Sequence, residues 1–326
     1  MKELNQFERY LVHEFVEDYQ DGLLSRRDMV ARVVRITGGV ATTATMLTTL
    51  GVAPLTASAQ SATPPPAPTP TGPRSPDSVA ADDSRVEAGD ITFPGPDGST
   101  LLAYQAMAAG GATPMADGAA GLPVVLICHE NRGLTDHIRD VARRWAAAGY
   151  LACAVDLLSP EGGTAAVADP ADIPAILTDG DVGRHVASFQ AAAAYYADQP
   201  GADTNRLGMT DYCFGGGITW RCATQMPELK AAAPYYGPPP PLEEVPNITA
   251  AVLGVYSDDP NDFANEGLQE LIAALEEADI TSDIKIYPNT QHAFHNDISP
   301  RWNEEQAQAA WADTLAWFNQ YVIEAS

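Results

Sequence analysis

Positive charge is scarce in this sequence. The 326 residues include 18 lysines and arginines against 43 aspartates and glutamates, which gives a formal net charge of −25 at pH 7. Such a charge repels phosphate groups, so the composition argues against nucleic acid and against an anionic membrane surface as partners. The surplus of acidic residues favours a soluble, acidic surface.

Cysteine is also rare, and the chain has four: Cys128, Cys153, Cys213 and Cys222. Their spacing matches no zinc-binding pattern and no dense disulfide framework, so no metal site is expected. Cys128 and Cys153 lie in apolar, strand-like runs and Cys222 in a helix-like run, which predicts buried packing residues. The sequence leaves open whether Cys128 and Cys153 pair.

The first 59 residues differ in character from the rest of the chain. Residues 1–24 are polar and amphipathic, and the arginine pair Arg26 and Arg27 precedes a moderately apolar stretch rich in threonine and glycine. Residues 57–59 (Ala-Ser-Ala) have the small-residue form of a signal cleavage site. Together these features are typical of a twin-arginine export signal. They predict an exported, periplasmic or extracellular protein, with the twin-arginine export machinery as a partner.

The alternative for this region is a retained membrane anchor. The threonines and glycines of residues 36–55 make a poor permanent span, so we expect cleavage and no stable membrane insertion after processing. An uncleaved signal would leave the protein membrane-anchored. Residues 60–85 are rich in proline, alanine, threonine and serine, which predicts an extended linker. Residues 86–326 are then left for one folded domain.

Strand-like and helix-like segments alternate through this domain. Apolar runs such as 123–128 and 150–156 lack polar alternation, as strands buried on both faces of a parallel sheet do. A turn signal at residues 94–98 predicts an N-terminal β-hairpin around it. The fold class is therefore α/β: a doubly wound, mostly parallel sheet with helices on both faces. Active residues are expected in loops beyond the carboxyl ends of the strands.

The most informative segment is residues 211–217, with the sequence DYCFGGG. It follows a short apolar run and precedes a helix-like run, which is the layout of a nucleophile elbow. Glycines after Cys213 let the helix backbone pass close to the strand, and the helix N-terminus favours a thiolate. Cys213 is therefore the candidate nucleophile, and the alternative is a small core residue.

A late segment, residues 287–297, supplies two histidines, His292 and His295. The order nucleophile, acid, histidine is the one found in α/β-hydrolases. A histidine here would take the thiol proton and later activate water. The loop after the strand-like run 250–256 offers carboxylates that would orient the imidazole and stabilise its charged form.

Several motifs together resemble the dienelactone hydrolases (carboxymethylenebutenolidases). They are residues 129–134 (HENRGL), 212–216 (YCFGG), 233–237 (APYYG) and 287–297 (YPNTQHAFHND). The resemblance extends over about residues 91–318, essentially the whole predicted domain. It implies an α/β-hydrolase fold and a Cys-His-Asp triad that cleaves esters and lactones.

The resemblance also ranks the candidates for the triad. It places the catalytic role on His292, with His295 as a weaker competitor. It makes Asp259, which stands before a proline, the expected acid. Asp262 is the rival because the loop carries an apparent insertion, and Asp258 comes third.

Other residues are expected around the nucleophile. Glu130 matches a family glutamate that contacts the resting cysteine and accepts its proton when substrate binds. The backbone N–H groups of Asn131 and Phe214 are positioned to form an oxyanion hole. Substrate contacts are expected from three further side chains: Arg132, Tyr212 and Tyr236. Arg132 would bind a substrate carboxylate or, alternatively, tie down its own loop.

Three features depart from the family pattern. Asp211 stands where a glycine is usual, which predicts either strain in the turn or a negative charge that disfavours the thiolate. Asn296 stands four residues after His292, where dienelactone-cleaving enzymes carry an arginine that holds the substrate carboxylate. The export signal is unusual for an enzyme of intracellular aromatic degradation.

The sequence therefore predicts a hydrolase that cleaves a small ester or lactone through an acyl-enzyme on Cys213, without a metal or an organic cofactor. One alternative is a broad carboxylesterase that acts outside the cell, for example on a polyester or a glycan ester. Another is a non-catalytic binding protein that kept the fold, which Asp211 and the altered acid loop favour. A redox-sensing protein would need a resolving cysteine near Cys213 in the sequence, and none is there.

Overall fold

The computed structural model describes residues 4, 6–20, 22, 24–52, 72–111 and 121–324. The chain divides into two compact units, Met1–Thr71 and Gly72–Ser326. The predicted cleavage site at residues 57–59 and residues 60–71 of the predicted linker lie outside the described residues.

The described part of the N-terminal unit is helical. It contains α1 (Gln6–Gln20), α2 (Arg26–Thr37) and α3 (Val40–Thr49). The paired arginines open α2, where the Ser25 hydroxyl caps the helix by accepting a hydrogen bond from the Asp28 amide at 3.2 Å. Among the residues described, no helix is both long enough and apolar enough to span a bilayer.

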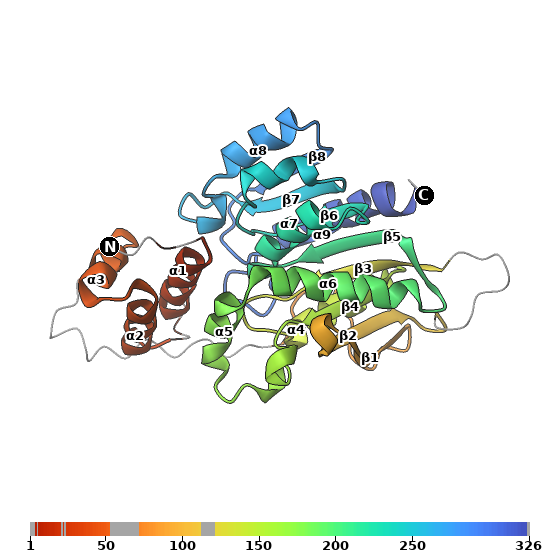
Figure 1. Ribbon diagram of the computed structural model, residues 1–326, viewed down its shortest axis with the longest axis horizontal. Helices are drawn as coiled ribbons and strands as arrows, with labels where there is room; N and C mark the ends of the chain where they lie inside the picture. Colours follow the sequence, from red (N-terminus) through yellow and green to blue (C-terminus); the bar gives the residue numbers. More distant parts are fainter. Residues whose placement is uncertain are drawn as a thin grey trace. The chain divides into compact units, whose positions relative to one another are not determined.

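The larger unit is built on an eight-stranded sheet with the order β1-β2-β4-β3-β5-β6-β7-β8 (Figure 1). β1 and β2 form the predicted hairpin and pair antiparallel, β2 pairs antiparallel with β4, and all other neighbours are parallel. The strands have these bounds: β1 (Val86–Pro94), β2 (Thr100–Ala108), β3 (Leu122–Cys128), β4 (Leu151–Asp156), β5 (Ala202–Asp211), β6 (Ala231–Ala233), β7 (Ala251–Ser257) and β8 (Ser282–Tyr287).

Helices cover both faces of the sheet, as predicted (Figure 1). The strand order explains why α6 and α7 lie on one face. The connections from β4 to β5 and from β5 to β6 both step towards the β8 edge of the sheet, and right-handed crossovers in one direction place their helices on the same face. The helices have these bounds: α4 (Asp136–Ala147), α5 (Ile173–Asp179), α6 (Val182–Ala197), α7 (Phe214–Gln225), α8 (Leu268–Glu277) and α9 (Glu304–Phe318). α5 was not predicted.

The other face is closed by α4 and α9. Trp145 of α4 packs edge-on against Trp311, with ring centroids 5.0 Å apart, and at a tilt against Phe318, with centroids 4.7 Å apart. All three side chains are buried, and burying rings of this size contributes roughly 2 kcal/mol or more each. This aromatic cluster fixes the two helices to each other beneath the sheet.

The six strands β3 to β8 run parallel and end at the same edge of the sheet. Residues expected in the site follow five of these ends: residues 129–132 after β3, 212–214 after β5, 236 after β6, 258–262 after β7 and 292 after β8. Because neighbouring parallel strands present their carboxyl ends together, segments far apart in the sequence meet here. β6 has only three residues, and Tyr235 pairs beyond it through an isolated bridge to Val255.

Candidate active site

Cys213 stands at the apex of the turn between β5 and α7. Its φ of 63° and ψ of −115° lie in a region that a residue with a side chain rarely adopts. Such a conformation costs about 1–3 kcal/mol and persists only where the surroundings impose it. The glycine at 215 is one such constraint, because a Cβ there would lie 2.8 Å from the Cys128 carbonyl oxygen. This is the strained strand-turn-helix geometry of a nucleophile elbow.

A second close approach explains the next glycine. A Cβ on Gly216 would lie 2.5 Å from the Cα of Gly237, which comes from the segment after β6. The backbones therefore touch directly, and the Cys213 amide donates to the Tyr235 carbonyl at 3.1 Å. The nucleophile turn is thus braced by the neighbouring strand segment.

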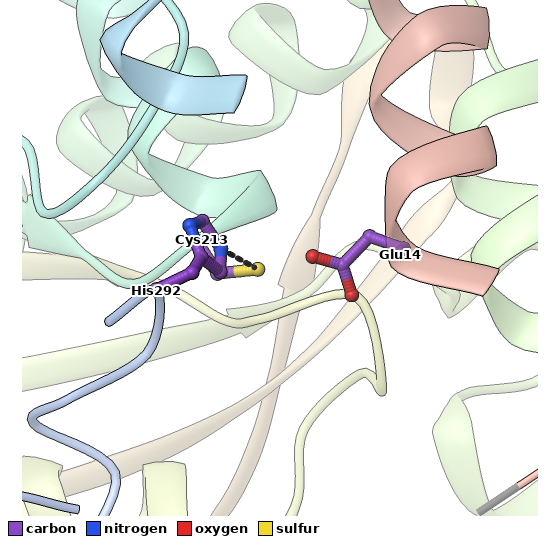
Figure 2. Close-up of side chains that lie close together, drawn as sticks. All are labelled: Glu14, Cys213 and His292. Atoms are coloured by element: carbon purple, nitrogen blue, oxygen red, sulfur yellow. Dashed lines mark hydrogen bonds between the residues drawn. The ribbon is translucent and has the colours of Figure 1, made fainter. Parts of the chain in front are cut away.

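Cys213 and His292 lie in hydrogen-bond contact (Figure 2). The distance from Cys213 Sγ to His292 Nε2 is 3.2 Å, and both residues are almost fully buried. On the other side of the ring, His292 Nδ1 lies 3.0 Å from Oδ1 of Asp262. A carboxylate can only accept, so Nδ1 carries a proton and Nε2 faces the sulfur, as a base for a thiol requires.

Asp262 is fixed by bonds of its own. The Ser257 hydroxyl donates to Oδ2 at 2.6 Å, and the Ala264 amide donates to Oδ1 at 2.9 Å. Burial raises the pKa of Asp262, but the charge of His292 and these hydrogen bonds outweigh it and lower the pKa overall. The carboxylate is therefore ionised and held in place to orient the imidazole.

The electrostatics of His292 follow from its two partners. Burial lowers the pKa of the His292 imidazole, but the Asp262 carboxylate and the Cys213 sulfur outweigh it and raise the pKa well above its ordinary value. A raised pKa means that the protonated ring is stable next to the sulfur. The arrangement can therefore hold a thiolate–imidazolium pair, which is the nucleophilic form of cysteine.

The structure brings Asp262, and not Asp259, to the imidazole. Asp259 Oδ1 accepts from the Asn261 amide at 2.9 Å and from its side-chain nitrogen at 3.1 Å, within its own turn. The Asp262 amide donates to the Asp259 carbonyl at 3.1 Å, so the turn carries Asp262 back towards the site. The expectation of Asp259 as partner of His292 is corrected in favour of its rival.

Asp258, the third candidate, has a different position. Its carboxylate accepts from the Asn289 amide at 2.8 Å and from the Thr290 amide at 2.9 Å. These backbone hydrogen bonds lower the pKa of Asp258. Asp258 therefore anchors the start of the segment that carries His292.

His295 packs below the nucleophile turn. Its ring stacks on Tyr212, with centroids 4.7 Å apart and an interplanar angle of 17°. Burial, and then the positive charge of Arg144, lower the pKa of His295 well below its ordinary value. A neutral, stacked ring fits a packing residue better than a base.

Glu130 and Asn296 face each other in the site. Asn296 Nδ2 lies 2.9 Å from each carboxylate oxygen of Glu130, and the glutamate is 6% exposed. Asn296, whose position departs from the family pattern, therefore holds the predicted glutamate. Asn131 follows on the same loop and is buried, whereas Arg132 is half-buried, and Phe214 opens α7 with a buried side chain.

Two tyrosines flank the turn segment: Tyr212 directly precedes Cys213, and Tyr236 follows β6. Tyr212 and Tyr236 are fully buried, and neither hydroxyl has a hydrogen-bond partner among the described residues. The Tyr236 ring meets the His292 ring edge-on with centroids 5.0 Å apart. A buried hydroxyl without a partner is costly, so each of these two groups retains an unused hydrogen-bonding capacity.

One positioning residue, His129, was missed in the sequence. Its Nδ1 lies 2.7 Å from the Glu130 carbonyl oxygen, and its Nε2 accepts from the Leu157 amide at 3.1 Å. Burial lowers the pKa of His129, so a neutral ring joins the ends of β3 and β4 and fixes the Glu130 backbone. A histidine directly after a fully apolar strand was the available signal.

Asp211 lies fully buried behind the nucleophile turn. Its Oδ1 accepts from the Tyr235 amide at 3.1 Å. Burial raises the pKa of Asp211 well above its ordinary value, which favours the neutral carboxyl. Burial therefore works against the predicted negative charge beside the thiol, and the carboxyl joins β5 to the segment after β6.

The raised pKa of Asp211 makes stability depend on pH. The folded state keeps a proton that the unfolded chain releases above about pH 4, so this group's stabilisation is lost as pH rises towards its folded pKa. We expect the free energy of unfolding of Asp211→Asn, which keeps the acceptor oxygen, to rise relative to that of the native protein as the pH increases above about 4. The rise should be at most about 1.4 kcal/mol per pH unit.

Urea unfolding at several pH values measures this difference. Asp198→Asn, at the exposed C-terminal end of α6, is the matched control and should follow the native protein at every pH. Parallel curves for Asp211→Asn and the native protein would show that Asp211 is ionised in the folded state.

An elbow cysteine bonded to a histidine late in the chain, on a mostly parallel sheet, places the protein in the α/β-hydrolase class. The family model for dienelactone hydrolases matches residues 108–322, which is more than half of the chain. The chain belongs to the dienelactone hydrolase family.

Individual proteins support this assignment. A protein of Salmonella typhi named "Putative carboxymethylenebutenolidase" is 36% identical over 267 residues, which cover 76% of this chain and 93% of that protein. Its namesake in Escherichia coli K12 is 35% identical over 261 residues, with coverage of 74% and 90%. A crystal structure titled "Putative Dienelactone Hydrolase", from Klebsiella pneumoniae, superposes with a TM-score of 0.65 at 32% identity and covers 72% of this chain and 99% of that one.

Proposed function

We propose that this protein hydrolyses a small ester or lactone through an acyl-enzyme on Cys213. The observation that carries the proposal is the continuous line of contacts from the sulfur to a buried carboxylate. Cys213 Sγ lies 3.2 Å from His292 Nε2, and His292 Nδ1 lies 3.0 Å from Asp262 Oδ1. Family membership supports ester or lactone bonds as the class of substrate.

The reaction follows from the protonation states of this triad. The Cys213 thiolate attacks the carbonyl carbon, and the carbonyl oxygen takes the negative charge of the tetrahedral intermediate. The imidazolium of His292 gives its Nε2 proton to the leaving oxygen as the carbon–oxygen bond breaks. Neutral Nε2 then takes a proton from water, whose oxygen attacks the thioester and releases the acid. Asp262 stabilises the charged ring at both stages.

The oxyanion is held by backbone donors in this proposal. The amides of Asn131, after β3, and Phe214, at the start of α7, are the two groups that the turn geometry offers. Donors of this kind are typically each worth about 3 kcal/mol of barrier. The N-terminus of α7 adds a positive partial charge on the same side.

The substrate is a neutral or hydroxylated ester rather than a carboxylated one. Glu130 presents a carboxylate beside the nucleophile, and the neutral amide of Asn296 holds it. A substrate carboxylate would lie close to this charge without an arginine at position 296 to offset it. The hydroxyls of Tyr212 and Tyr236 supply polar contacts for an uncharged group. We also propose that residues 1–59 direct the protein out of the cytoplasm.

Hydrolysis of two substrates tests the proposal. The purified protein should turn over p-nitrophenyl acetate, and mass spectrometry of a rapidly quenched reaction should find the acetyl group on the peptide that contains Cys213. Dienelactone, which carries a carboxylate, should be cleaved with a lower kcat/KM. A folded protein without turnover of either substrate would favour the non-catalytic binding protein instead.

Replacing Asn296 with arginine should shift the balance between these substrates. The added guanidinium offsets the charge of Glu130 and can pair with a substrate carboxylate, and a charge-assisted hydrogen bond of about 1.5 kcal/mol corresponds to roughly tenfold in kcat/KM. We therefore expect the ratio of dienelactone to p-nitrophenyl acetate kcat/KM to rise about tenfold.

Asn296→Gln is the matched control, because it keeps a neutral amide near Glu130. Its substrate ratio should stay close to that of the native protein. An unchanged ratio in a folded Asn296→Arg variant would show that position 296 does not set the preference.

A further inference from the structure

The segment before the first strand contacts the loop that carries the catalytic histidine. We call residues 74–79 the strap and residues 289–303 the histidine loop. Arg74 Nε donates to the Asp297 carbonyl at 2.7 Å, and its Nη2 donates to the Ser299 carbonyl. The guanidinium also lies over the Trp302 ring, 4.7 Å from its centroid. One arginine side chain therefore holds three positions of the histidine loop.

The Asp297 carboxylate forms the centre of this attachment. Its Oδ2 accepts from the amides of Arg74 at 3.1 Å and Ser75 at 2.9 Å, and from the Arg144 guanidinium at 2.9 Å. His137 Nδ1 lies 3.0 Å from Oδ1. Burial raises the pKa of Asp297, but the bond to His137 and the charge of Arg144 outweigh it and lower the pKa well below its ordinary value. The carboxylate is therefore ionised, and its Oδ2 accepts three hydrogen bonds inside the protein.

The other end of the strap is fixed to α4. The Val79 amide donates to Asp140 Oδ1 at 2.7 Å, and Arg143 Nε donates to the Val79 carbonyl at 2.6 Å. Asp140 Oδ2 in turn accepts from Arg144 Nε at 2.9 Å. The strap, α4 and Asp297 thus form one network of buried charges and backbone groups.

The histidine loop is held at its start by Asp258 and near its end by the strap, and residues between these two points contact the candidate active site. At its start, Asp258 holds the amides of Asn289 and Thr290. His292 then meets Cys213, and Asn296 meets Glu130 immediately before Asp297. A displacement at Asp297 would therefore be transmitted along a few residues of chain to the imidazole.

We propose that Arg74 is a positioning residue, which keeps His292 in hydrogen-bond contact with Cys213 by holding the far end of the histidine loop. The inference rests on the proposed function, because its effect is read through the Cys213 thiol. A misplacement of about 1 Å in a catalytic group can lower a rate by roughly 100-fold, so losing the side-chain part of this anchor is expected to cost about tenfold.

The test compares two arginine variants of the full chain. Arg74→Ala removes the side-chain bonds to the histidine loop and keeps the backbone bond to Asp297. Arg85→Ala removes a surface pair with Asp83, in which the arginine side chain is 68% exposed. Both arginines lie in the segment before β1, so the two variants change the same residue type in the same part of the chain. With p-nitrophenyl acetate, Arg74→Ala should lose about tenfold in kcat with KM within twofold, and Arg85→Ala should match the native protein.

A second measurement separates positioning from a general loss of stability. The rate of iodoacetamide alkylation of Cys213 against pH, followed on the Cys213 peptide, gives the apparent pKa of the thiol. A loosened imidazole stabilises the thiolate less, so this pKa should rise towards the ordinary thiol value of about 8.5 in Arg74→Ala only. Arg74→Lys keeps a donor for the loop carbonyls and should restore part of both quantities.

Each outcome decides one of the two proposals. An Arg74→Ala variant whose kcat and thiol pKa equal those of Arg85→Ala overturns the inference. If Cys213→Ala retains turnover, the proposed function fails, while the alkylation profiles of the two arginine variants still decide whether the strap positions His292.

Discussion

Replacing Cys213 with alanine is expected to abolish ester hydrolysis, with a loss of kcat/KM of about 10⁴-fold or more. The variant has no nucleophile to form the thioester, and the backbone oxyanion donors alone leave only a small residual rate. Initial rates with p-nitrophenyl acetate measure the effect. Circular dichroism should show the native fold, because one small buried side chain replaces another.

Cys222→Ala is the matched control for this experiment. Cys222 is also fully buried, and it lies on α7 in the third turn after the nucleophile. Its removal changes packing by one atom and should leave kcat/KM close to native. Equal losses in both variants would point to a packing role for Cys213, and native activity in Cys213→Ala would contradict the acyl-enzyme mechanism.

Asp262→Asn should give the second large effect, a fall in kcat of about 10²–10⁴-fold. The amide cannot stabilise the imidazolium and favours the wrong tautomer of His292. Without the carboxylate, the pKa of His292 falls towards its ordinary value, so less of the thiolate–imidazolium pair forms at neutral pH. Rates with p-nitrophenyl acetate between pH 5 and 9 measure both the loss and the change in profile.

Asp259→Asn separates the two carboxylates. Asp259 accepts hydrogen bonds within its own turn, so its replacement should change kcat by no more than about threefold, as for ordinary surface positions. A large loss of kcat in Asp259→Asn together with a small loss in Asp262→Asn would favour Asp259 as the acid, as expected from the sequence. It would contradict the role of the Asp262–His292 contact.

The sequence alone was sufficient to predict the fold and the turn that carries Cys213, the proposed nucleophile. The apolar runs at β3 and β4 lack polar alternation because helices cover both sides of the sheet, and that pattern is local. Cys213 was recognisable because a strand, a turn rich in glycine and a helix follow one another within a few residues. The structure adds the steric reason, since no Cβ fits at position 215.

The local sequence pattern could not predict which aspartate contacts His292. Three aspartates stand within five positions after β7, and the path of a short turn decides which one faces the ring. The Asp262 amide bonds to the Asp259 carbonyl, and this turn reverses the chain so that the last carboxylate points to His292. Composition and spacing carry no information on this direction.

Long-range burial explains the remaining differences. The sequence predicts strain or a negative charge at Asp211, but full burial raises the pKa of this carboxyl and so favours its neutral form. The contact of Arg74 with Asp297 joins residues that are 223 positions apart in the sequence, and no local sequence pattern predicts it. Residues 74–79 fall within the range predicted as an extended linker, yet their backbone and side chains bond to α4 and to the histidine loop.

The order of the sheet also has a consequence for the chain during its synthesis. Cys213 precedes His292 by 79 residues, and His292 follows all eight strands of the described sheet. A nascent chain therefore carries the thiol before the imidazole that the proposed function assigns to it as a base. Translation that stops between these two residues would yield the cysteine without this histidine, so the proposed pair forms only after β8 has been made.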